Sequence, residues 1–522
     1  MSKKDWWRGA VIYQIYPRSF MDSNGDGIGD LKGITSRLPY VADLGVDGIW
    51  LSPFFKSPMK DFGYDVSDYR AVDPLFGTLA DFDELLATAH RLGLKVIIDQ
   101  VLNHTSDQHV WFKESLQSRD NPKANWYVWA DPKPDGTPPN NWPSVFGGPA
   151  WTFNARRGQY YMHSFLSSQP DLNFHCPEMQ DALFDDCRFW LGKGVDGFRL
   201  DAINHCYHDS HLRDNPARPW TQTTSTQLDF PAPYAMQTHI YSKSRPENLA
   251  LMERIQRLCD EYGAMTLGEI GADNANELAA QYTAPGRLNT CYSFSLLGGR
   301  KVKLTAAFIK NAVMDFFREG PDSWPSWAFS NHDVVRSASR FAPEGNPDPR
   351  LAKMLIALLC CLRGTPFLYQ GEELGLPEAQ LAYEDLQDPW GIALWPEWQG
   401  RDGCRTPIPW DSSNRHAGFT SAHKTWLPVP PCHIGLNVEN QQSDRDSVLS
   451  FTQQFLKQRK YLPALIRGDI AFIDTGREDI LAFTRTSEGQ TVSCAFNLGE
   501  TDQTYNGDML PPYGYRLQTK AL

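Results

Sequence analysis

The sequence predicts a (β/α)8 barrel, the TIM-barrel fold, because eight short apolar or β-branched runs alternate with longer segments of helical period. Such alternation is typical of parallel strands joined by crossover helices, and eight repeats favour a closed barrel over an open sheet. The eight candidate strands, in order, are VIYQIYP near Val11, GIWLSP near Gly48, KVIIDQV near Lys95, GFRLD near Gly197, MTLGEI near Met265, NTCYSF near Asn289, SWAFSNHD near Ser326 and PFLYQGEE near Pro366.

Helical segments separate these strands. The clearest begins at Leu79 with LADFDELLATAHRLG, whose apolar positions recur at three- and four-residue steps, and Gly93 predicts its end. A further helix is expected near Ser447 to Tyr461. In a barrel of this kind, functional side chains collect at the carboxyl ends of the strands.

Two stretches are too long to be simple connections. Residues from His104 to about His175 are rich in Pro, Asn, Gly and Trp and exceed the usual limit of about 12 to 15 residues for a structureless loop, so we expect a loop-rich domain inserted after the third strand. A second insertion, Cys206 to about Arg245, follows the fourth strand.

The tail from about Gly468 changes to short alternating runs, DILAFTRT and TVSCAFNL, which predict a small C-terminal antiparallel β domain. We therefore assign residues 1–103 and 176–465 to the barrel, 104–175 to the inserted domain and 466–522 to the C-terminal domain.

Composition excludes some classes of partner. The formal net charge of −12 disfavours nucleic acids and acidic membrane surfaces, whose binding depends on Lys and Arg.

The start, MSKKDWWRG, lacks the apolar stretch of a signal peptide, and the apolar run Met354 to Leu362 is too short to cross a bilayer. Ten cysteines show no CxxC or metal-ligand spacing, so we expect reduced thiols in a cytoplasmic protein. The oligomeric state is left open.

The run GFRLD holds an unusual polar pair. Residues two apart on a strand share a face, so Arg199 and Asp201 point one way while Phe198 and Leu200 point the other. Alone, this pair is explained by an ion pair inside the barrel. Other strand ends carry similar groups, any of which alone could be a cap or turn residue: Asp99, Asn103 and His104 in DQVLNH, Glu269 in GEIG, and His332 and Asp333 in SNHD. Their shared position at the carboxyl rim predicts an active site.

These groups suit acid–base chemistry. The Arg199 guanidinium is expected to lower the pKa of Asp201 by about 1 to 3 units, which favours an ionised nucleophile. Repulsion and desolvation are expected to raise the pKa of Glu269 toward about 6, which favours a proton donor. Retaining cleavage of a glycosidic bond needs such a pair, with the carboxyl groups about 5 to 5.5 Å apart.

Together, DQVLNH, GFRLDA, GEIG and SNHD resemble the four ordered signature regions of the α-amylase family, glycoside hydrolase family 13, and the match spans nearly the whole chain. The resemblance implies that Asp201 is the nucleophile, Glu269 the acid/base and Asp333 the transition-state stabiliser. It also implies that the sugar at the cleavage point is bound by Asp99, His104, Arg199 and His332.

Within that family, QPDLN at residues 169–173 resembles the α-glucosidase and oligo-1,6-glucosidase branch, which implies short substrates. DFGYDVSDY and GRDGCRTP are similar to segments that close the pocket around the non-reducing glucose. The residues this implies for the pocket are Asp61, Tyr64, Arg401 and the aromatic residues Phe146 and Phe165. The residue after the nucleophile is Ala202, where the branch has valine or threonine, so the preferred linkage stays open.

The stretch DSNGDGIGD carries oxygen ligands at regular steps and resembles a calcium loop of the EF-hand kind. The twelfth position is Gly33 rather than a bidentate Glu. An Asx-rich turn without metal is the alternative. The resemblance implies one structural divalent cation, Ca²⁺ or Mg²⁺, bound by Asp22, Asn24, Asp26, Ile28 and Asp30, and no organic cofactor.

The sequence thus predicts a retaining, exo-acting α-glucosidase that releases glucose from the non-reducing end of short α-glucosides, with transglucosylation as a side reaction. Its partners are small sugar substrates. An enzyme of the trehalose synthase or sucrose isomerase type is the alternative, because both share this machinery. An amylase-like transporter subunit is disfavoured, since such proteins carry a membrane-spanning helix.

Overall fold

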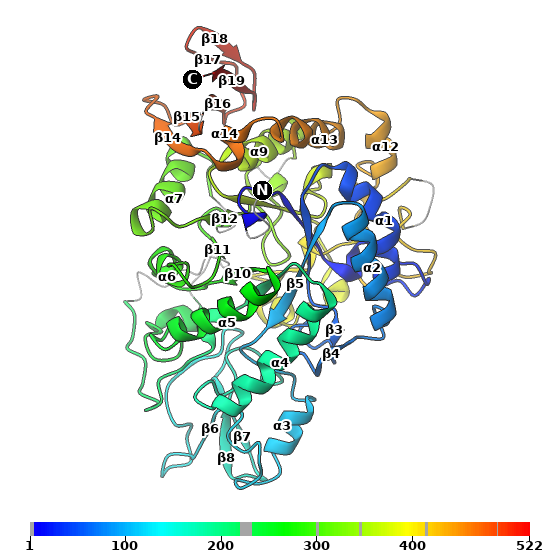
Figure 1. Ribbon diagram of the computed structural model, residues 1–522. Coiled ribbons are helices and arrows are strands. Elements are labelled where there is room, and N and C mark those ends of the chain that lie inside the picture. Colours follow the sequence, from blue (N-terminus) through cyan, green and yellow to red (C-terminus); the bar gives the residue numbers. More distant parts are fainter. Residues whose placement is uncertain are drawn as a thin grey trace. The chain divides into compact units, whose positions relative to one another are not determined.

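The computed structural model describes residues 5–219, 232–298, 302–343, 347–412, 416–487 and 489–521 (Figure 1). The chain forms two compact units. The first comprises Met1–Leu51, Glu84–Val96 and Tyr292–Leu522, and the second comprises Ser52–Asp83 and Ile97–Cys291.

The eight predicted strands form a closed barrel in the order β1-β13-β12-β11-β10-β9-β5-β2, which confirms the predicted fold class. The strand pairs β1–β2, β1–β13, β12–β13, β5–β9 and β9–β10 are parallel. The barrel strands are β1 (Ile12–Ile15), β2 (Gly48–Leu51), β5 (Lys95–Val101), β9 (Gly197–Asp201), β10 (Met265–Glu269), β11 (Thr290–Tyr292), β12 (Pro325–Trp327) and β13 (Thr365–Tyr369).

The helices between the strands begin and end where sequence chemistry predicts. Helix α4 (Pro177–Lys193) has proline in its first turn and ends at Gly194, whose φ of 101° is the left-handed conformation favoured by glycine. The predicted helix from Leu79 is α2 (Leu79–Arg91), and the helix expected near Ser447 is α13 (Val448–Arg459), with the Ser447 side chain as its N-cap.

The second unit holds β5, β9 and β10 together with the helices α4, α5 (Asn248–Tyr262) and α6 (Ala275–Tyr282). The strands β3 (Phe55–Lys56) and β4 (Asp68–Val72) pair antiparallel. The predicted insertion contains α3 (Val110–Ser115) and an antiparallel three-stranded sheet of β6 (Trp129–Ala130), β8 (Gln159–Met162) and β7 (Trp151–Asn154).

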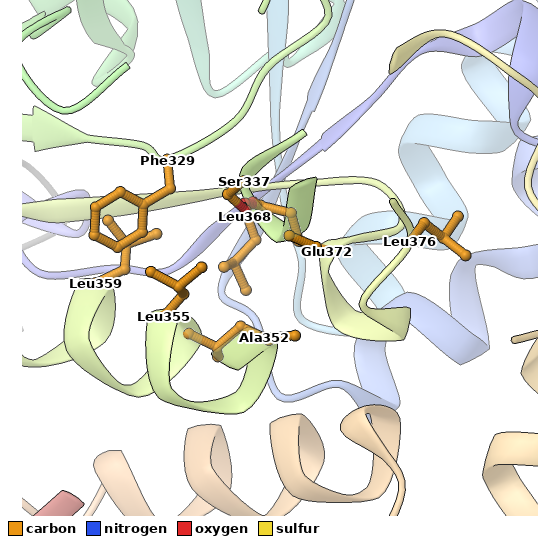
Figure 2. A pocket seen from close by; sticks show the side chains of 10 residues that line it. Phe329, Ser337, Ala352, Leu355, Leu359, Leu368, Glu372 and Leu376 are labelled. Atoms are coloured by element: carbon orange, nitrogen blue, oxygen red, sulfur yellow. The ribbon is translucent and has the colours of Figure 1, made fainter. Parts of the chain in front are cut away.

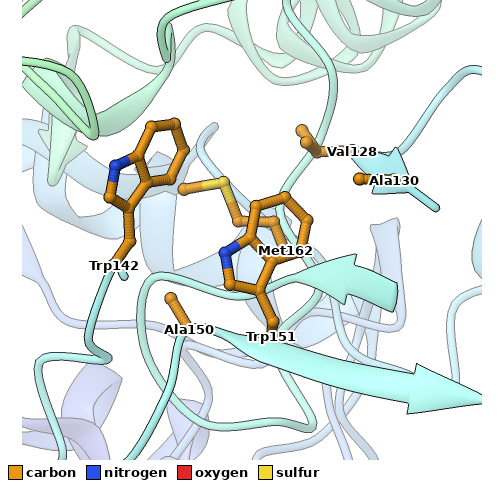
Figure 3. Close-up of a cluster of buried hydrophobic side chains, with 6 residues drawn as sticks. All are labelled: Val128, Ala130, Trp142, Ala150, Trp151 and Met162. Atoms are coloured by element: carbon orange, nitrogen blue, oxygen red, sulfur yellow. The ribbon is translucent and has the colours of Figure 1, made fainter. Parts of the chain in front are cut away.

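This insertion has a small core of its own. The indole rings of Trp142 and Trp151 lie beside Met162 in Figure 3, with ring centroids 6.1 Å apart, and all three residues are at most 2% exposed. Val128, Ala130 and Ala150 complete the buried cluster. The loop-rich stretch is therefore held by aromatic packing rather than by long secondary structure. Of the second predicted insertion, residues 220–231 lie outside the described part of the chain.

The first unit holds the barrel strands β1, β2, β12 and β13 together with the C-terminal tail. Its helices are α1 (Leu31–Asp43), α7 (Ala306–Glu319), α8 (Ser337–Arg340), α9 (Pro349–Cys361), α10 (Pro389–Leu394), α11 (Pro431–Ile434), α12 (Val438–Ser443), α13 and α14 (Pro463–Arg467). The tail forms an antiparallel sheet in the order β14-β15-β16-β19 and a separate pair β17–β18, as predicted. Their bounds are β14 (Asp469–Ile473), β15 (Ile480–Ser487), β16 (Gln490–Asn497), β17 (Gln503–Tyr505), β18 (Asp508–Leu510) and β19 (Tyr515–Ala521).

A small cavity in the first unit lies beside α9 (Figure 2). Leu355, Leu359 and Phe329 line it, and the Glu372 carboxylate reaches its edge. Its volume of about 10 Å³ has room for at most about one water molecule, so it is no sugar site.

The ten cysteines all lie in the described residues and none forms a disulfide; eight are buried, which fits the predicted role as core thiols. Among the helices that the structure describes, none is both long enough and apolar enough to span a bilayer.

Candidate active site

Strand register gathers polar side chains in the second unit. Asp99 on β5 pairs directly with Arg199 on β9, so the pleat turns both side chains to one face. The β9–β10 register brings Glu269, the last residue of β10, level with Asp201, the last residue of β9. Four predicted site residues from three neighbouring strands therefore come together.

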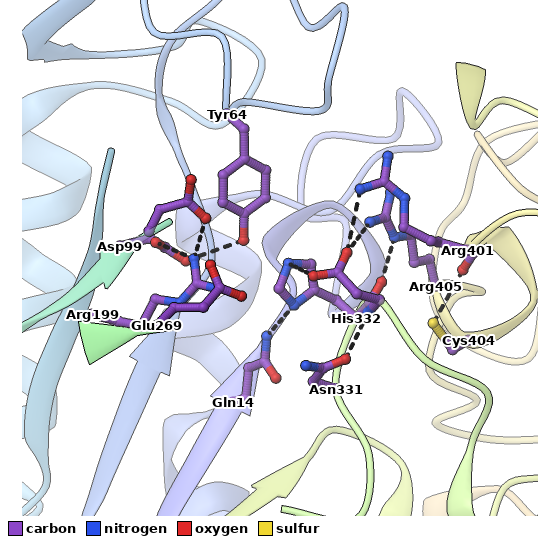
Figure 4. A network of polar contacts seen from close by, with 12 residues as sticks. Gln14, Tyr64, Asp99, Arg199, Glu269, Asn331, His332, Arg401, Cys404 and Arg405 are labelled. Atoms are coloured by element: carbon purple, nitrogen blue, oxygen red, sulfur yellow. Dashed lines mark hydrogen bonds and ion pairs between the residues drawn. The ribbon is translucent and has the colours of Figure 1, made fainter. Parts of the chain in front are cut away.

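These residues form one ion-pair cluster, which we call the Arg199 cluster (Figure 4). Arg199 Nη1 lies 2.9 Å from Asp99 Oδ1 and 2.6 Å from Asp201 Oδ1, and Nη2 lies 2.6 Å from Glu269 Oε1. The Arg199 and Asp99 side chains are 1% and 0% exposed, whereas those of Asp201 and Glu269 are 11% and 13% exposed. The two carboxyls with predicted chemical roles are thus the ones that a small molecule can reach.

The pKa of Asp201 is raised rather than lowered, so the sequence prediction was wrong in direction. Burial raises this pKa to about 7, and the Asp99 carboxylate adds to the rise, although Arg199 opposes it. The prediction counted the guanidinium but not that three carboxyls share it. Burial also lowers the pKa of Arg199, yet Asp99 and Glu269 outweigh burial and hold it well above its ordinary value, so Arg199 stays charged.

The chain leaves β9 in a strained turn. Ala202 adopts φ 42° and ψ 38°, in the left-handed region, and its N–H donates to Glu269 Oε2 at 3.0 Å. One oxygen of Glu269 therefore faces a backbone amide and the other faces Arg199. Such strain at a functional carboxylate is a common feature of active sites.

Tyr64 and His104 lie beside this cluster. The Tyr64 hydroxyl donates to Asp99 Oδ2 at 3.2 Å, and the Arg199 guanidinium lies 5.9 Å from the centroid of the tyrosine ring. The His104 Nε2 atom lies 3.2 Å from the carbonyl oxygen of Tyr64. Burial lowers the pKa of His104 to about 3, so its ring is neutral.

The remaining predicted pocket residues of the second unit extend from His104. Gln169 Nε2 lies 3.2 Å from His104 Nε2 and donates to Asp61 Oδ2 at 3.1 Å. The Phe165 ring lies 5.2 Å from His104, and Phe146 packs edge-on against Phe165 at 5.9 Å. The structure thus places Asp61, His104, Phe165 and Phe146 in one continuous set of contacts.

A second cluster, which we call the Asp333 cluster, lies in the first unit (Figure 4). Asp333 Oδ1 lies 2.8 Å from Arg405 Nη2 and 3.3 Å from Arg401 Nη1. Arg401 also binds Asp388 through its backbone N–H at 2.8 Å, Nε at 3.0 Å and Nη2 at 2.7 Å. Arg401, predicted as a sugar clamp, is therefore already fixed by a bidentate carboxylate.

His332 is oriented from both sides of its ring. Its Nδ1 lies 2.8 Å from Gln14 Nε2, an amide nitrogen that can only donate, so Nδ1 accepts and the proton lies on Nε2. Nε2 faces Asp333 Oδ2 at 3.3 Å. Arg405 Nε donates to the His332 carbonyl at 2.6 Å and locks the backbone beneath.

The sequence analysis missed four residues in or near these clusters: Gln14, Asp171, Asp388 and Arg405. Asp171 accepts from Asn103 Nδ2 at 3.2 Å and from Ser164, and burial raises its pKa to about 7. Arg405 lies within GRDGCRTP, whose second arginine was a usable signal. Asp388 and Gln14 show no local pattern, because their partners are distant in sequence.

The predicted metal loop is held by its own hydrogen bonds. Asp22 Oδ1 accepts from the N–H groups of Asn24 and Gly25, Asp26 Oδ1 accepts from Ile28, and Asp30 Oδ1 accepts from Gly33 as the N-cap of α1. The side-chain and backbone atoms that could bind a metal here are all oxygen, which suits a hard cation. Among the described residues no group of three or more His, Cys, Asp or Glu side chains is arranged to hold a metal. The cation therefore stays a prediction.

Similarity to a known family classifies the chain that carries these clusters. Residues 14–468 match the family model described as the alpha amylase catalytic domain. The chain belongs to the α-amylase family, glycoside hydrolase family 13.

Individual relatives indicate the branch of the family to which the chain belongs. The chain is 54% identical over 504 residues to a probable alpha-glucosidase of Rhizobium meliloti (strain 1021), which covers 96% of this chain and 91% of the relative. It is 38% identical over 544 residues to an oligo-1,6-glucosidase of Heyndrickxia coagulans, covering 96% and 94% of the two chains. Among solved structures, that of the alpha-glucosyl transfer enzyme XgtA matches with a TM-score of 0.95 at 54% identity, over 98% of this chain and 99% of that chain. This α-amylase family member is thus in the α-glucosidase and oligo-1,6-glucosidase branch.

Proposed function

We propose that this chain is a retaining, exo-acting α-glucosidase that releases glucose from the non-reducing end of short, maltose-type α-glucosides. The observation that carries the proposal is the Arg199 cluster, in which Asp201 and Glu269 contact one guanidinium at 2.6 Å each. The names of the relatives, alpha-glucosidase and oligo-1,6-glucosidase, support the same substrate class.

In the first step, an Asp201 carboxylate oxygen attacks the anomeric carbon while Glu269 gives its proton to the leaving oxygen. A covalent glucosyl ester forms on Asp201, and the leaving sugar departs as a neutral alcohol. The charge of the cluster suits this step, because the Arg199 guanidinium cannot neutralise three carboxylates and one proton is therefore held among them.

In the second step, Glu269 takes a proton from an incoming hydroxyl, whose oxygen attacks the anomeric carbon and releases Asp201. Water as the incoming group gives glucose, and a sugar hydroxyl gives a new disaccharide. The similar protein XgtA is an alpha-glucosyl transfer enzyme, which favours transfer as a second outcome of the same chemistry.

The glucose before the cleavage point is bound by the predicted pocket residues. Tyr64 supplies a ring face, and His104 and Asp99 supply hydrogen-bonding groups. For Asp333, His332 and Arg401 the predicted roles are kept: Asp333 stabilises positive charge at the anomeric carbon, and the other two bind ring hydroxyls. These roles rest on the family membership.

A panel of maltose, isomaltose, sucrose, trehalose, maltotriose and 4-nitrophenyl α-glucoside tests the proposal. We expect maltose to give two glucose molecules per bond cleaved, with the α-anomer formed first by NMR. Formation of the β-anomer first would contradict a retaining mechanism. Conversion of maltose or sucrose to an isomer without free glucose would favour the synthase or isomerase alternative.

Two further proposals concern a bound cation and the cellular compartment. We propose that Asp22, Asn24, Asp26, Ile28 and Asp30 hold one structural Ca²⁺ or Mg²⁺, with no organic cofactor, and that the protein acts in the cytoplasm. If the loop binds a cation, millimolar Ca²⁺ or Mg²⁺ should raise the Tm relative to EDTA, and Asp26→Ala should abolish that difference.

A further inference from the structure

Gln14 is a buried polar residue of the barrel to which the proposed reaction gives no role. It lies on β1 and is 1% exposed. Its amide nitrogen Nε2 lies 2.8 Å from Nδ1 of His332, which is 318 residues away along the chain (Figure 4). This contact connects the first barrel strand to the histidine that precedes Asp333.

The amide of Gln14 fixes the protonation state of His332. Because an amide nitrogen can only donate, Nδ1 of the histidine must accept and carries no proton. A ring with a lone pair on Nδ1 is neutral, and its single proton lies on Nε2, which faces Asp333 Oδ2 at 3.3 Å. The hydrogen bond from Gln14 therefore opposes conversion of the ring to a charged imidazolium.

Asp333 acts on His332 in the opposite direction. A carboxylate beside a histidine favours the charged form of the ring, because it attracts the second proton. The His332 side chain is 0% exposed, so bulk water does not compete for its nitrogen atoms. Without the donor from Gln14, Nδ1 would be free to take that proton. The Gln14 amide is thus the contact that keeps the ring neutral beside a carboxylate.

The other neighbours of His332 hold the plane of its ring. Tyr16 stacks on it with centroids 5.8 Å apart, and burial raises the pKa of the Tyr16 hydroxyl, which therefore stays neutral. Trp50 packs edge-on at 5.9 Å. Arg405 donates through Nε to the His332 carbonyl at 2.6 Å and through Nη2 to Asp333 Oδ1 at 2.8 Å. The ring therefore keeps one orientation, with Nδ1 toward Gln14 and Nε2 toward Asp333.

A neutral His332 preserves the charge balance of the Asp333 cluster. In that cluster two guanidinium groups, those of Arg401 and Arg405, face two carboxylates, those of Asp333 and Asp388. A charged ring would set three cations against these two carboxylates. The additional positive charge would lie beside Asp333 and would oppose the positive charge that develops at the anomeric carbon in the transition state.

We infer that Gln14 is a positioning residue for the reaction: by donating to Nδ1 it keeps His332 neutral, and so leaves Asp333 able to stabilise positive charge at the anomeric carbon. Asp333 is 16% exposed and within reach of a sugar, whereas Gln14, at 1% exposed, acts only through the histidine. This inference rests on the proposed function, in which Asp333 has that stabilising role.

The test replaces the donor by an acceptor of nearly the same size. Gln14→Glu offers a carboxylate to Nδ1 and therefore favours the charged ring. We expect kcat on maltose to fall about tenfold or more and KM to change less than about threefold, because the charge at the anomeric carbon develops only in the transition state. Inhibition by 1-deoxynojirimycin, a cationic glucose analogue, should weaken about tenfold, and inhibition by neutral glucose less than about threefold.

Two further variants separate this role from folding. Gln14→Met removes the donor without adding an acceptor, so it should lie between wild type and Gln14→Glu in both measurements, and it replaces that variant should the latter fail to fold. Gln441→Glu makes the same change at a buried glutamine of α12, whose Nε2 donates to the carbonyls of Leu374 and Leu436 at 2.9 Å each. It should lower the Tm but leave kcat and the ratio of the two inhibition constants unchanged.

A Gln14→Glu variant with the kcat of wild type would overturn the inference. Equal weakening of inhibition by 1-deoxynojirimycin and by glucose would also overturn it and would assign Gln14 a structural role. Either result would leave the proposed function intact, since the wild type would still hydrolyse maltose. Wild-type protein that is inactive on maltose would instead overturn the proposed function and this inference with it.

Discussion

The two ion-pair clusters differ in their charge balance. In the Arg199 cluster one guanidinium contacts three carboxyl groups, whereas in the Asp333 cluster Arg401 and Arg405 contact two carboxylates, those of Asp333 and Asp388. Burial raises the pKa of Asp201 to about 7 despite Arg199. Burial also raises the pKa of Asp388, but Arg401 outweighs it and the pKa is lowered.

This difference separates two uses of buried charge. A cluster with more carboxyls than cations holds a proton that can move, which suits acid–base chemistry. A balanced cluster has no such proton and instead fixes side chains in one geometry. Loss of a carboxyl from the Arg199 cluster is therefore expected to lower mainly the rate, and loss of Asp388, which holds Arg401 in place, to lower mainly the stability.

The largest effect is expected from a substitution in the Arg199 cluster. Asp201→Asn removes the nucleophile and should lower kcat on maltose by at least about 10³-fold, as far as nucleophile loss does in other covalent mechanisms. Retention of more than a few per cent of the activity would argue against this assignment. Its fold should persist, because Arg199 keeps Asp99 and Glu269 as partners.

Asp388→Asn is the counterpart in the balanced cluster. It leaves the buried Arg401 guanidinium short of one charge and should lower the free energy of unfolding by about 3 kcal/mol or more. Thermal denaturation of the two variants side by side checks this. A larger loss of Tm in Asp201→Asn than in Asp388→Asn would reverse the assignment of roles.

Glu269→Gln should act through the leaving group. Loss of general acid catalysis should lower kcat on maltose by about 10²- to 10⁴-fold, and much less on 4-nitrophenyl α-glucoside, whose leaving group departs without a proton. Steady-state rates on both substrates measure this ratio. Equal losses on the two would count against Glu269 as the acid.

The pH dependence of stability should have opposite signs in the two clusters. Asp201 has a folded pKa of about 7 against about 3.9 when unfolded, so the folded state binds more protons between these values and Asp201 destabilises the fold progressively as pH rises from about 4 to 7. Asp388 has a lowered pKa, so its stabilisation is present above about pH 4 and is lost as pH falls through its folded pKa.

Denaturant titrations at pH 5 and pH 8 measure this difference. Relative to wild type, Asp201→Asn should gain on the order of 1 to 4 kcal/mol between pH 5 and pH 8. Asp388→Asn should remain destabilised at both pH values. If the difference in unfolding free energy between wild type and Asp201→Asn does not change with pH, the Asp201 carboxyl does not ionise between pH 5 and pH 8.

The smallest effect concerns the turn after Asp201. Ala202 has φ 42°, so Ala202→Gly should be near neutral, whereas the β-branched Ala202→Val should cost about 1 to 3 kcal/mol of stability. Measurement of both by thermal denaturation checks the strain. If valine is tolerated as well as glycine, the backbone at this position is not constrained, and the small residue was selected for another reason.

Local pattern predicted the strands and much of the Arg199 cluster. All eight strands were found, since each is a short apolar run bounded by turn residues, and Arg199 and Asp201 share a face by strand period alone. The family resemblance supplied Tyr64, which contacts the predicted residue Asp99, and Asp61, which contacts Gln169.

Charge balance could not be predicted in this way. The shift of the Asp201 pKa depends on how many carboxyls share Arg199 and how deeply they are buried, and neither quantity is written in a motif. Asp388 and Gln14 were missed for a related reason, because their partners Arg401 and His332 lie 13 and 318 residues away.

Asp99, Arg199, Asp201 and Glu269 all lie on barrel strands, whereas the aromatic residues Phe146 and Phe165 lie on the insertion between β5 and β9. Exchange of this insertion between related enzymes should therefore change which sugars are bound and which products are formed. The reacting carboxyl groups on the strands should stay the same.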